Sequence, residues 1–156
     1  MLAGGPRDYM PRVASGESWA SSENVRAAMR GNRSTDTRPE LALRSLLHAR
    51  GLRYRLRERP VIGLRRTPDI LFGPARLAVF VDGCFWHGCP AHSNLPNAHR
   101  EYWTAKIGRN QERDRETDAI LAANGWKVVR AWEHDDPKDI AEMIVAVVIE
   151  RRQEHR

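Results

Sequence analysis

The sequence predicts an α/β fold in which a small central mixed sheet is flanked by helices. Two observations carry this prediction: segments with helical spacing of apolar residues alternate with short apolar runs, and Gly, Pro and Asp mark the ends of these segments. A length of 156 residues suits one domain with a core. The expected order is helix, three strands, helix, strand, helix.

The first helix is expected to begin after Thr37 and to end at Gly51. Thr37 can cap its first turn, which holds Pro39, and Glu40 stands three residues after Thr37 as in a capping box. A glycine is a common left-handed end of a helix. Four leucines form the apolar face: Leu41, Leu43, Leu46 and Leu47.

Three segments after this helix are predicted to be strands. In residues 53–57 apolar side chains alternate with arginines, which is the period of a strand with one buried face. Residues 68–72 and 77–81 are apolar runs joined by a Gly-Pro turn, and the second run ends at an Asp-Gly pair.

The second half of the chain continues the alternation. A loop with histidines and prolines covers residues 84–98, and a long helix is expected over residues 101–124 with Gly125 as its cap. Residues 126–132 are predicted to form the fourth strand. The last helix starts at Asp135, Asp136 and Pro137 and has apolar residues at helical spacing: Ile140, Met143, Ile144, Val147 and Val148.

Composition and charge limit the function classes. The 26 Lys and Arg residues exceed the 20 Asp and Glu residues by six, which favours a polyanionic partner such as nucleic acid. No apolar run is long enough for a membrane span or a signal peptide, so we expect a cytoplasmic protein without a membrane partner. Two cysteines cannot form the disulfide framework of a small secreted domain. Residues 1–28 are expected to be a flexible arm, residues 29–150 the domain and residues 151–156 a tail.

Two carboxylates are candidates for a metal site. Asp69 begins one predicted strand and Asp82 ends the next, so a hairpin would bring them to neighbouring strand ends. Mg²⁺ prefers such oxygen ligands and can activate a phosphodiester for hydrolysis. Pro-Asp and Asp-Gly are also common turn pairs, which is the alternative interpretation.

The loop after the third strand has the spacing of a zinc site. Cys84, Cys89 and His92 offer three ligands in nine residues, and His134 after the fourth strand can supply the fourth. His87 and His99 compete for the ligand role. A local disulfide and two free core thiols are the alternatives.

Aromatic and polar residues near this loop are candidate DNA contacts. Phe85 and Trp86 on a metal-stapled loop can enter a distorted base step, although they can also be ordinary core aromatics. Lys106 and Asn110, in the first half of the long helix, have the chemistry for phosphate or base contacts. Acidic residues interleave the later basic ones, which favours a solvated surface there.

Taken together, the motifs resemble those of the very short patch repair (Vsr) DNA mismatch endonucleases over roughly residues 29–135. Six pieces in the same order carry the resemblance: Met29-Arg30, DTRPE at 36–40, Pro68-Asp69, VFVDGCFWHGC at 79–89, YWTAKIGRNQERD at 102–114 and GWKVVRAWEH at 125–134. The resemblance implies a restriction-endonuclease-like core with a structural zinc loop. It also implies an enzyme that uses Mg²⁺ to nick one strand of duplex DNA beside the thymine of a thymine–guanine mismatch.

The resemblance also implies roles for individual residues. Asp69 is expected to bind catalytic Mg²⁺, assisted by the main-chain carbonyl of Val81, and His87 to act as general base. Glu40 is expected to be the supporting acid. Asp82 stands where the best-known members have a histidine, so it is a candidate second metal ligand.

The remaining implied roles concern zinc and DNA. The proposed zinc ligands are Cys84, Cys89, His92 and His134, the last at a position that holds cysteine in the best-known members. Met29, Phe85 and Trp86 are expected to form the wedge, and Lys106 and Asn110 align with base-reading positions. The expected partner is mismatched DNA near the nucleoid, with a monomeric enzyme and mismatch-repair proteins as further partners. Two alternatives stay open, a non-catalytic zinc-stapled DNA-binding module and a nuclease of the same fold acting on other lesions or undamaged sites.

Overall fold

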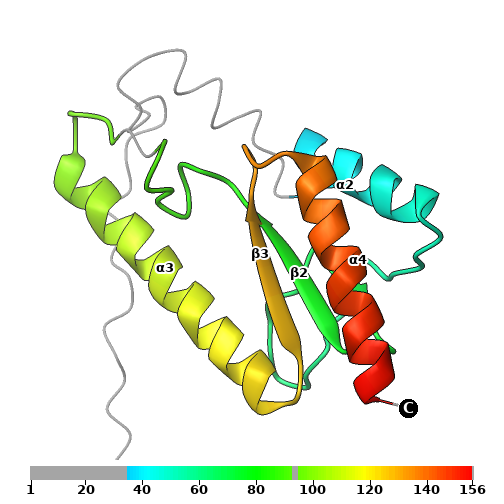
Figure 1. Cartoon of the computed structure of the whole chain (residues 1–156). Helices are drawn as coiled ribbons and strands as arrows, with labels where there is room; N and C mark the ends of the chain where they lie inside the picture. Colours follow the sequence, from blue (N-terminus) through cyan, green and yellow to red (C-terminus); the bar gives the residue numbers. More distant parts are fainter. Residues whose placement is uncertain (1–34, 93–94, 156) are drawn as a thin grey trace, which may run out of the picture. The chain divides into compact units, whose positions relative to one another are not determined.

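The computed structural model describes residues 35–92 and 95–155. These residues form three helices and three strands, in an order that Figure 1 shows along the chain: α2 (Arg38–Ala49), β1 (Ile70–Phe72), β2 (Leu77–Asp82), α3 (Arg100–Ala123), β3 (Lys127–Trp132) and α4 (Pro137–Glu154). The chain therefore has the predicted α/β architecture with a small central sheet. Met29 and the expected arm at residues 1–28 lie outside the described residues.

The sheet is mixed, as predicted, and its strand order is β1-β2-β3. β1 and β2 are antiparallel, with Ile70 opposite Val79, whereas β2 and β3 are parallel, with Val79 opposite Val129. The carboxyl ends of β2 and β3 therefore lie side by side. Because β1 runs the other way, its first residues meet the same end of the sheet.

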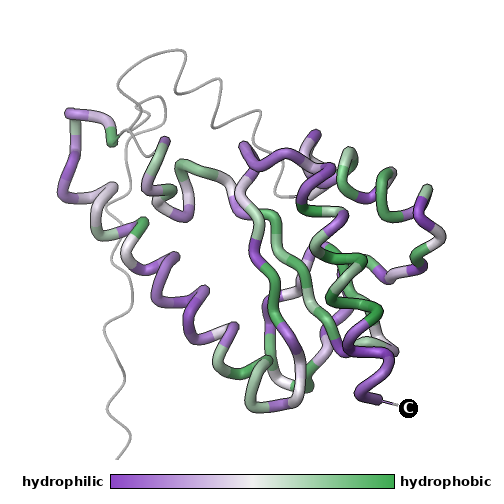
Figure 2. The backbone as a smooth tube through the Cα atoms, in the orientation of Figure 1, coloured by the Kyte–Doolittle hydropathy of each residue, from purple (hydrophilic) through white to green (hydrophobic). Residues whose placement is uncertain are grey.

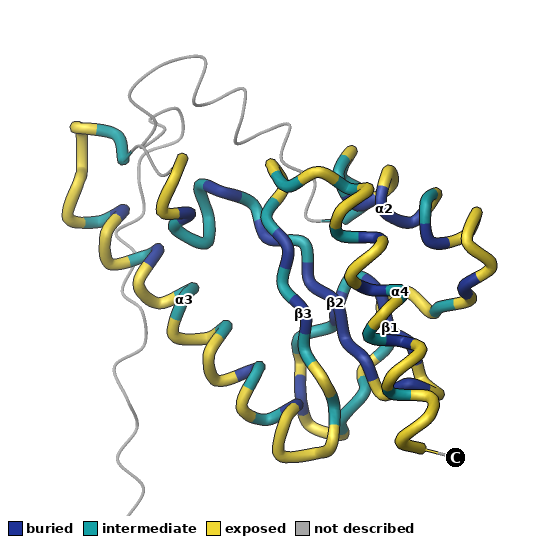
Figure 3. Tube along the Cα trace, viewed as in Figure 1, coloured by how far each residue is buried: buried dark blue, intermediate teal, exposed yellow. Residues whose placement is uncertain are grey.

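Side chains that alternate along the strands build two apolar layers. On one face, Ile70, Phe72 and Val79 pack with α2 and α4, and on the other face Leu71, Phe80 and Leu121 form a smaller cluster beneath α3. Figure 3 shows the buried residues along β2, which both layers cover. Figure 2 shows that much of α3 is hydrophilic, in contrast to α4, so α3 presents a polar surface beside the sheet.

The helix boundaries follow the predicted capping residues. The Thr37 hydroxyl accepts a hydrogen bond from the Glu40 amide, and the Glu40 carboxylate accepts one from the Asp36 amide at 3.0 Å. Gly125 follows α3 with a left-handed φ of 78°. Asp136 caps α4 through the amide of Lys138.

The predicted strand over residues 53–57 is wrong. Only Arg55 pairs with the sheet, in an isolated bridge to Leu71. Leu56, which alternation placed on a buried face, is exposed, and Arg57 adopts a left-handed φ of 57° that ends the ladder. The alternation of arginines in this segment therefore reflects an exposed loop rather than a half-buried strand, and the sheet has one strand fewer than expected.

The end of the chain continues α4. Residues 151–154, expected as a tail, belong to this helix, and Arg151 donates hydrogen bonds to the carbonyl oxygens of Ala75 and Gly125. No helix within the described residues is both long enough and apolar enough to cross a membrane.

Candidate active site and metal-binding loop

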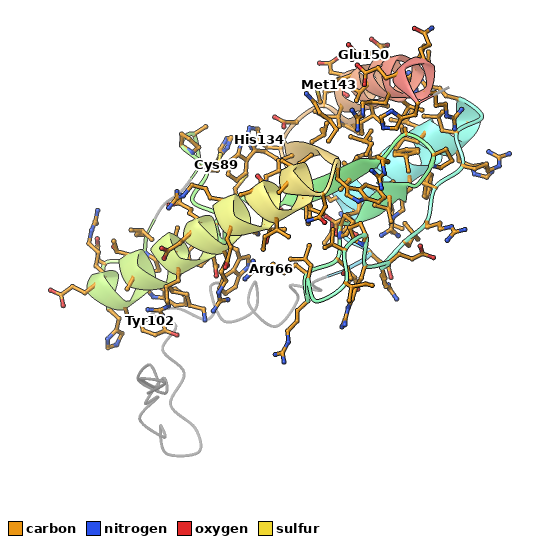
Figure 4. The ribbon with its side chains drawn as sticks, turned by 90° about the horizontal axis from the view of Figure 1, so that it is seen from below. Arg66, Cys89, Tyr102, His134, Met143 and Glu150 are labelled. Carbon is orange, nitrogen blue, oxygen red and sulfur yellow. The ribbon has the colours of Figure 1, made fainter. Side chains whose placement is uncertain are left out.

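The four predicted zinc ligands meet at the carboxyl ends of β2 and β3. Cys84 and Cys89 follow β2 and His134 follows β3, so the parallel pairing of these strands brings the two segments together. The Cys84 Sγ atom lies 3.0 Å from His134 Nδ1, and Cys89 Sγ lies 3.7 Å from His92 Nδ1. All four ligand atoms lie within 4.8 Å of one another. Figure 4 shows Cys89 and His134 close together beside the ribbon of α3.

Two of these spacings match a tetrahedral zinc site: Cys89 Sγ lies 3.7 Å from His92 Nδ1 and 3.8 Å from His134 Nδ1, whereas the Cys84–His134 spacing of 3.0 Å is shorter. With bonds of about 2.3 Å to sulfur and 2.0–2.1 Å to nitrogen, neighbouring ligand atoms of a tetrahedron are about 3.3–3.8 Å apart. Both cysteines are buried and free, and the loop turns back on itself because the Cys89 amide donates to the Cys84 carbonyl at 2.9 Å. Burial, followed by the adjacent Cys89 thiol and Glu133 carboxylate, raises the pKa of Cys84 to about 12. A divalent cation at this point would stabilise the thiolates that burial disfavours.

His87 lies outside the zinc group and belongs to a second cluster. Its Nδ1 atom is 2.6 Å from Oδ2 of Asp114, on α3, and 3.8 Å from Oδ1 of Asp82, at the end of β2. A carboxylate acceptor at Nδ1 places the ring proton there and leaves Nε2 as an acceptor. The three side chains border a pocket of about 320 Å³ between α3 and β3.

Arg130 connects the acidic residues of this pocket. Its Nη1 donates to both oxygens of Asp82 at 2.9 and 3.0 Å, and its Nε and Nη2 donate to Asp118 at 2.8–3.0 Å. The guanidinium lies over the ring of Phe80, 4.4 Å from its centroid. Asp82 is therefore a partner of Arg130 as well as a candidate metal ligand. Burial raises the pKa of Asp82, although the charge of Arg130 opposes this effect.

Asp69 lies at the same end of the sheet, next to β2. One of its carboxylate oxygens accepts a hydrogen bond from the Val81 amide at 2.7 Å. Burial raises the pKa of Asp69 to about 6, and the charges of Glu40 and Asp82 add to the increase against the opposing effect of the Val81 hydrogen bond. Asp69, Glu40 and Asp82 thus influence one another. Asp69 is not in the group of Asp82, His87 and Asp114, whose ligand atoms lie within 4.8 Å of one another.

Glu40 is buried at the start of α2, where it also serves the fold. Its carboxylate accepts hydrogen bonds from Arg44 at 2.9 Å and from the Thr37 hydroxyl at 3.1 Å. Arg44 bonds in turn to Asp36. Glu40 is therefore held in place beside Asp69 by side chains of its own helix.

Residues of α3 fix the conformation of the loop that carries His87. Asn110 donates a hydrogen bond to the Trp86 carbonyl at 2.9 Å, and Gln111 donates one to the His87 carbonyl at 3.2 Å. Gly88 has a φ of 64°, and a Cβ atom there would lie only 2.5 Å from the Gln111 amide nitrogen. The loop therefore needs glycine at this position to approach α3.

The predicted wedge residues form an aromatic cluster with α3. Phe85 and Trp86 are half-buried, their ring centroids are 5.1 Å apart, and Phe85 also contacts the buried Trp103 at 5.4 Å. Lys106 is half-buried one turn further along α3. Both wedge rings are thus partly exposed and pack against Trp103 of α3.

Three functional candidates were not predicted from the sequence: Asp114, Arg130 and Glu133. The first two line the pocket with His87, and Glu133 accepts a hydrogen bond from the Cys84 amide at 2.8 Å. The spacing of Gln111, Asp114 and Asp118 on one helix face was the available signal for Asp114. It was hidden among the other charges of α3.

Sequence comparisons with known proteins identify the relatives of this chain. Residues 20–93 match the family model for DNA mismatch endonuclease Vsr. The chain is 44% identical to the type II nicking enzyme V.NaeI of Lentzea aerocolonigenes over 75% of this chain and 72% of that protein. It is 46% identical to the type II nicking enzyme V.XorIIP of Xanthomonas oryzae over 72% and 82% of the two chains. It is also 37% identical to the DNA mismatch endonuclease Vsr of Escherichia coli, over 72% and 68%.

These matches define the class first: the chain is a DNA endonuclease. Within that class it belongs to the Vsr family of DNA mismatch endonucleases, which confirms the resemblance of the motifs. A non-catalytic DNA-binding module, one of the two alternatives left open by the sequence, does not agree with these relatives.

Proposed function

We propose that the protein nicks one strand of duplex DNA beside the thymine of a thymine–guanine mismatch in a reaction that requires Mg²⁺. The observation that carries this proposal is the geometry around His87. Its Nδ1 contacts Asp114 at 2.6 Å, so its Nε2 faces away from that carboxylate as a proton acceptor. Asp82 lies 3.8 Å from this imidazole, and the charge of Asp82 also acts on Asp69. Cleavage of a phosphodiester needs such a base next to a cation site.

The residues of the pocket divide the chemical work. His87 takes the proton of the attacking water, and Asp114 holds the imidazole in the productive tautomer and stabilises its charged form. Glu40, held by Arg44, orients water from the side of Asp69. Arg130 pairs with both Asp82 and Asp118 and so fixes the positions of these two carboxylates in the pocket.

Mg²⁺ would be held by Asp69 with the main chain of Val81, and Asp82 would be a second ligand that it shares with Arg130. The fit rests on the clustering of oxygen donors: burial raises the pKa of Asp69 to about 6, and the nearby charges of Glu40 and Asp82 add to this increase. When bound, the cation supplies charge neutralisation at the scissile phosphate. Zn²⁺ would be held by Cys84, Cys89, His92 and His134 as a structural ion.

Mismatch selection is assigned to the aromatic cluster. A mispaired step unstacks more readily than a paired one, so rings pressed into the duplex test its deformability. Phe85 and Trp86, together with Met29, would form this wedge, and Trp103 supports it from α3. Zinc would fix the loop that carries both the wedge and His87, which links recognition to cleavage. Lys106 and the amide oxygen of Asn110 would contact the bases nearby.

The remaining expectations complete the proposal. We propose that residues 29–150 form a restriction-endonuclease-like domain and that residues 1–28 are an N-terminal arm. The enzyme would act as a monomer near the nucleoid of the cytoplasm and pass nicked DNA to mismatch-repair proteins. These features follow from the family resemblance.

A nicking assay tests the proposed reaction. Wild-type protein with Mg²⁺ is expected to nick the thymine strand of a thymine–guanine duplex, and Asp69→Ala is expected to bind this duplex without nicking it. Binding without cleavage by the wild type would refute the proposed reaction. Parallel duplexes that are matched or contain uracil or hypoxanthine test the second candidate, an enzyme of the same fold with another lesion preference, because nicking would then be faster on one of them.

A further inference from the structure

One exposed segment carries most of the excess positive charge of the chain. Residues 53–66, here called the arginine segment, contain six arginines and one glutamate, a net charge of +5 in a chain of net charge +6. Four of the arginines are exposed in the loop before Leu64: Arg53, Arg55, Arg57 and Arg59. Arg65 is exposed as well, and Arg66 is half-buried. Such a local excess of arginine is unfavourable unless an anionic partner compensates it.

The arginine segment is attached to the fold at three points, so it has a defined position. Arg55 and Leu71 exchange two main-chain hydrogen bonds of 2.9 Å at the edge of β1. Leu64 is buried in the apolar cluster under α3. Arg66 donates to the Arg113 carbonyl at 2.7 Å and also bonds the hydroxyl of Thr117, both on α3. Figure 4 shows Arg66 beside α3.

These attachments place the arginine segment next to the candidate active site. Leu64 packs on the same face of the sheet as Phe80, the ring that lies under Arg130 in the pocket. The segment ends three residues before Asp69. Near its other end, Arg57 forms an ion pair of 2.6 Å with Asp36, the residue before the N-cap of α2. Its middle projects outward, because Ile62 at the turn is fully exposed. The arginine segment is therefore anchored on the sheet face that α3 covers, and α3 also carries Asp114, the partner of His87.

Only some of these arginines form ion pairs within the fold. Arg55 pairs with Glu58 and Arg66 with Glu116, both on the surface. Arg53, Arg59 and Arg65 form no ion pair with any residue that the structure describes. Guanidinium groups free of carboxylates on a segment of fixed position are suited to bind phosphate oxygens.

We propose that the arginine segment is a second DNA-contacting surface, which binds the phosphate backbone of the duplex flanking the cut through Arg53, Arg59 and Arg65. The proposal rests on duplex DNA as the substrate of this endonuclease. It does not depend on which base pair is recognised, because phosphate contacts carry no sequence information. The segment would thus add affinity for the duplex, while the aromatic cluster would select the mismatched base step.

The salt dependence of DNA binding tests this proposal. Each phosphate contact contributes about −0.9 to the slope of log K against log [salt], which corresponds to about 15-fold in affinity at 50 mM salt and about 4-fold at 200 mM. The variant Arg59→Gln/Arg65→Gln removes two exposed cations that form no ion pair with the described residues and take no part in the proposed chemistry. Lys127→Gln/Arg152→Gln is the matched control, since it removes the same charge from exposed positions at the start of β3 and the end of α4.

Binding is measured without Mg²⁺ on a matched 20-base-pair duplex at several salt concentrations. We expect Arg59→Gln/Arg65→Gln to reduce the magnitude of the slope by about 1–2 and the affinity at 50 mM by more than about 10-fold. The control is expected to change the affinity by less than about 3-fold, and Arg59→Lys/Arg65→Lys is expected to keep the slope. Equal losses in the two Gln variants, or an unchanged slope in the first, would overturn the proposal.

The same variants separate this proposal from the proposed reaction. At saturating DNA, Arg59→Gln/Arg65→Gln is expected to nick a thymine–guanine duplex at the wild-type rate, because the arginines act in binding. A several-fold loss of that rate would contradict the assigned role. If the wild type fails to nick this duplex, the proposed reaction is wrong, whereas the salt slopes still decide whether the arginine segment contacts DNA.

Discussion

Replacing Asp69 with asparagine is expected to stabilise the metal-free protein at neutral and alkaline pH while abolishing its activity. Burial, with Glu40 and Asp82 as neighbours, raises the pKa of Asp69 from 3.8 to about 6. The folded protein therefore binds the Asp69 proton more tightly than the unfolded chain does. As pH rises from 3.8 through about 6, this group lowers the free energy of unfolding, and above that pH the full cost is present.

The size of the expected change in the free energy of unfolding follows from the pKa shift of Asp69. A change of about two pKa units corresponds to about 3 kcal/mol at pH 8, and about half of that cost is already present at pH 5. Asparagine carries no charge at either pH, and its side-chain oxygen can still accept the hydrogen bond from the Val81 amide. Asp69→Asn should therefore raise the free energy of unfolding by up to about 3 kcal/mol at pH 8 and by about half as much at pH 5.

Urea unfolding of the metal-free variant and wild type at the two pH values measures this difference. Glu150→Gln is the control, because Glu150 is on the exposed side of α4 (Figure 4) and its replacement removes the same charge. The reasoning is refuted if Asp69→Asn lowers the free energy of unfolding, or if it raises this free energy equally at pH 5 and pH 8. Either result would mean that the buried Asp69 carboxylate does not destabilise the metal-free fold.

Three further variants test the loop and its support. Asp114→Asn removes a charge-assisted hydrogen bond to His87, so the single-turnover nicking rate should fall about 10- to 100-fold with DNA affinity unchanged. A wild-type rate would remove Asp114 from the mechanism. Cys89→Ser should reduce bound zinc, measured by elemental mass spectrometry, from about one ion per chain to nearly none and lower the melting temperature. Full zinc content in this variant would contradict the ligand set. Gly88→Ala should destabilise the fold by about 1–3 kcal/mol in urea unfolding, because the methyl group meets Gln111 and the φ is positive. An unchanged stability would show that the loop does not need its close approach to α3.

Local signals explain which parts of the fold could be predicted. The first turn of α2 is determined by Thr37 and Glu40, which bond within one turn of helix, so their spacing in the sequence was sufficient. β2 is apolar from Leu77 to Val81 because helices cover both faces of the sheet. The prediction of a strand at residues 53–57 was wrong because the alternation of apolar residues and arginines also fits an exposed loop. This loop pairs with the sheet only at Arg55.

The parts of the candidate site that consist of rare residue types could be predicted, whereas those that consist of common charged residues could not. Cysteines and histidines are few, so the spacing of Cys84, Cys89 and His92 indicated a metal-binding group, and the structure brings these residues together with His134. Asp114 stands among many charges of α3, and only the packing of the loop against that helix shows which of them meets His87.

The cleavage pattern on a strand-labelled duplex tests the central claim most directly. Each strand of a thymine–guanine duplex and of the matching thymine–adenine duplex carries its own 5′ label, and the wild type is incubated with Mg²⁺ or with EDTA. We expect one product, from the thymine strand cut beside the mismatched thymine, only in the presence of Mg²⁺. Cleavage of both strands, equal cutting of the thymine–adenine duplex, or full activity in EDTA would contradict it.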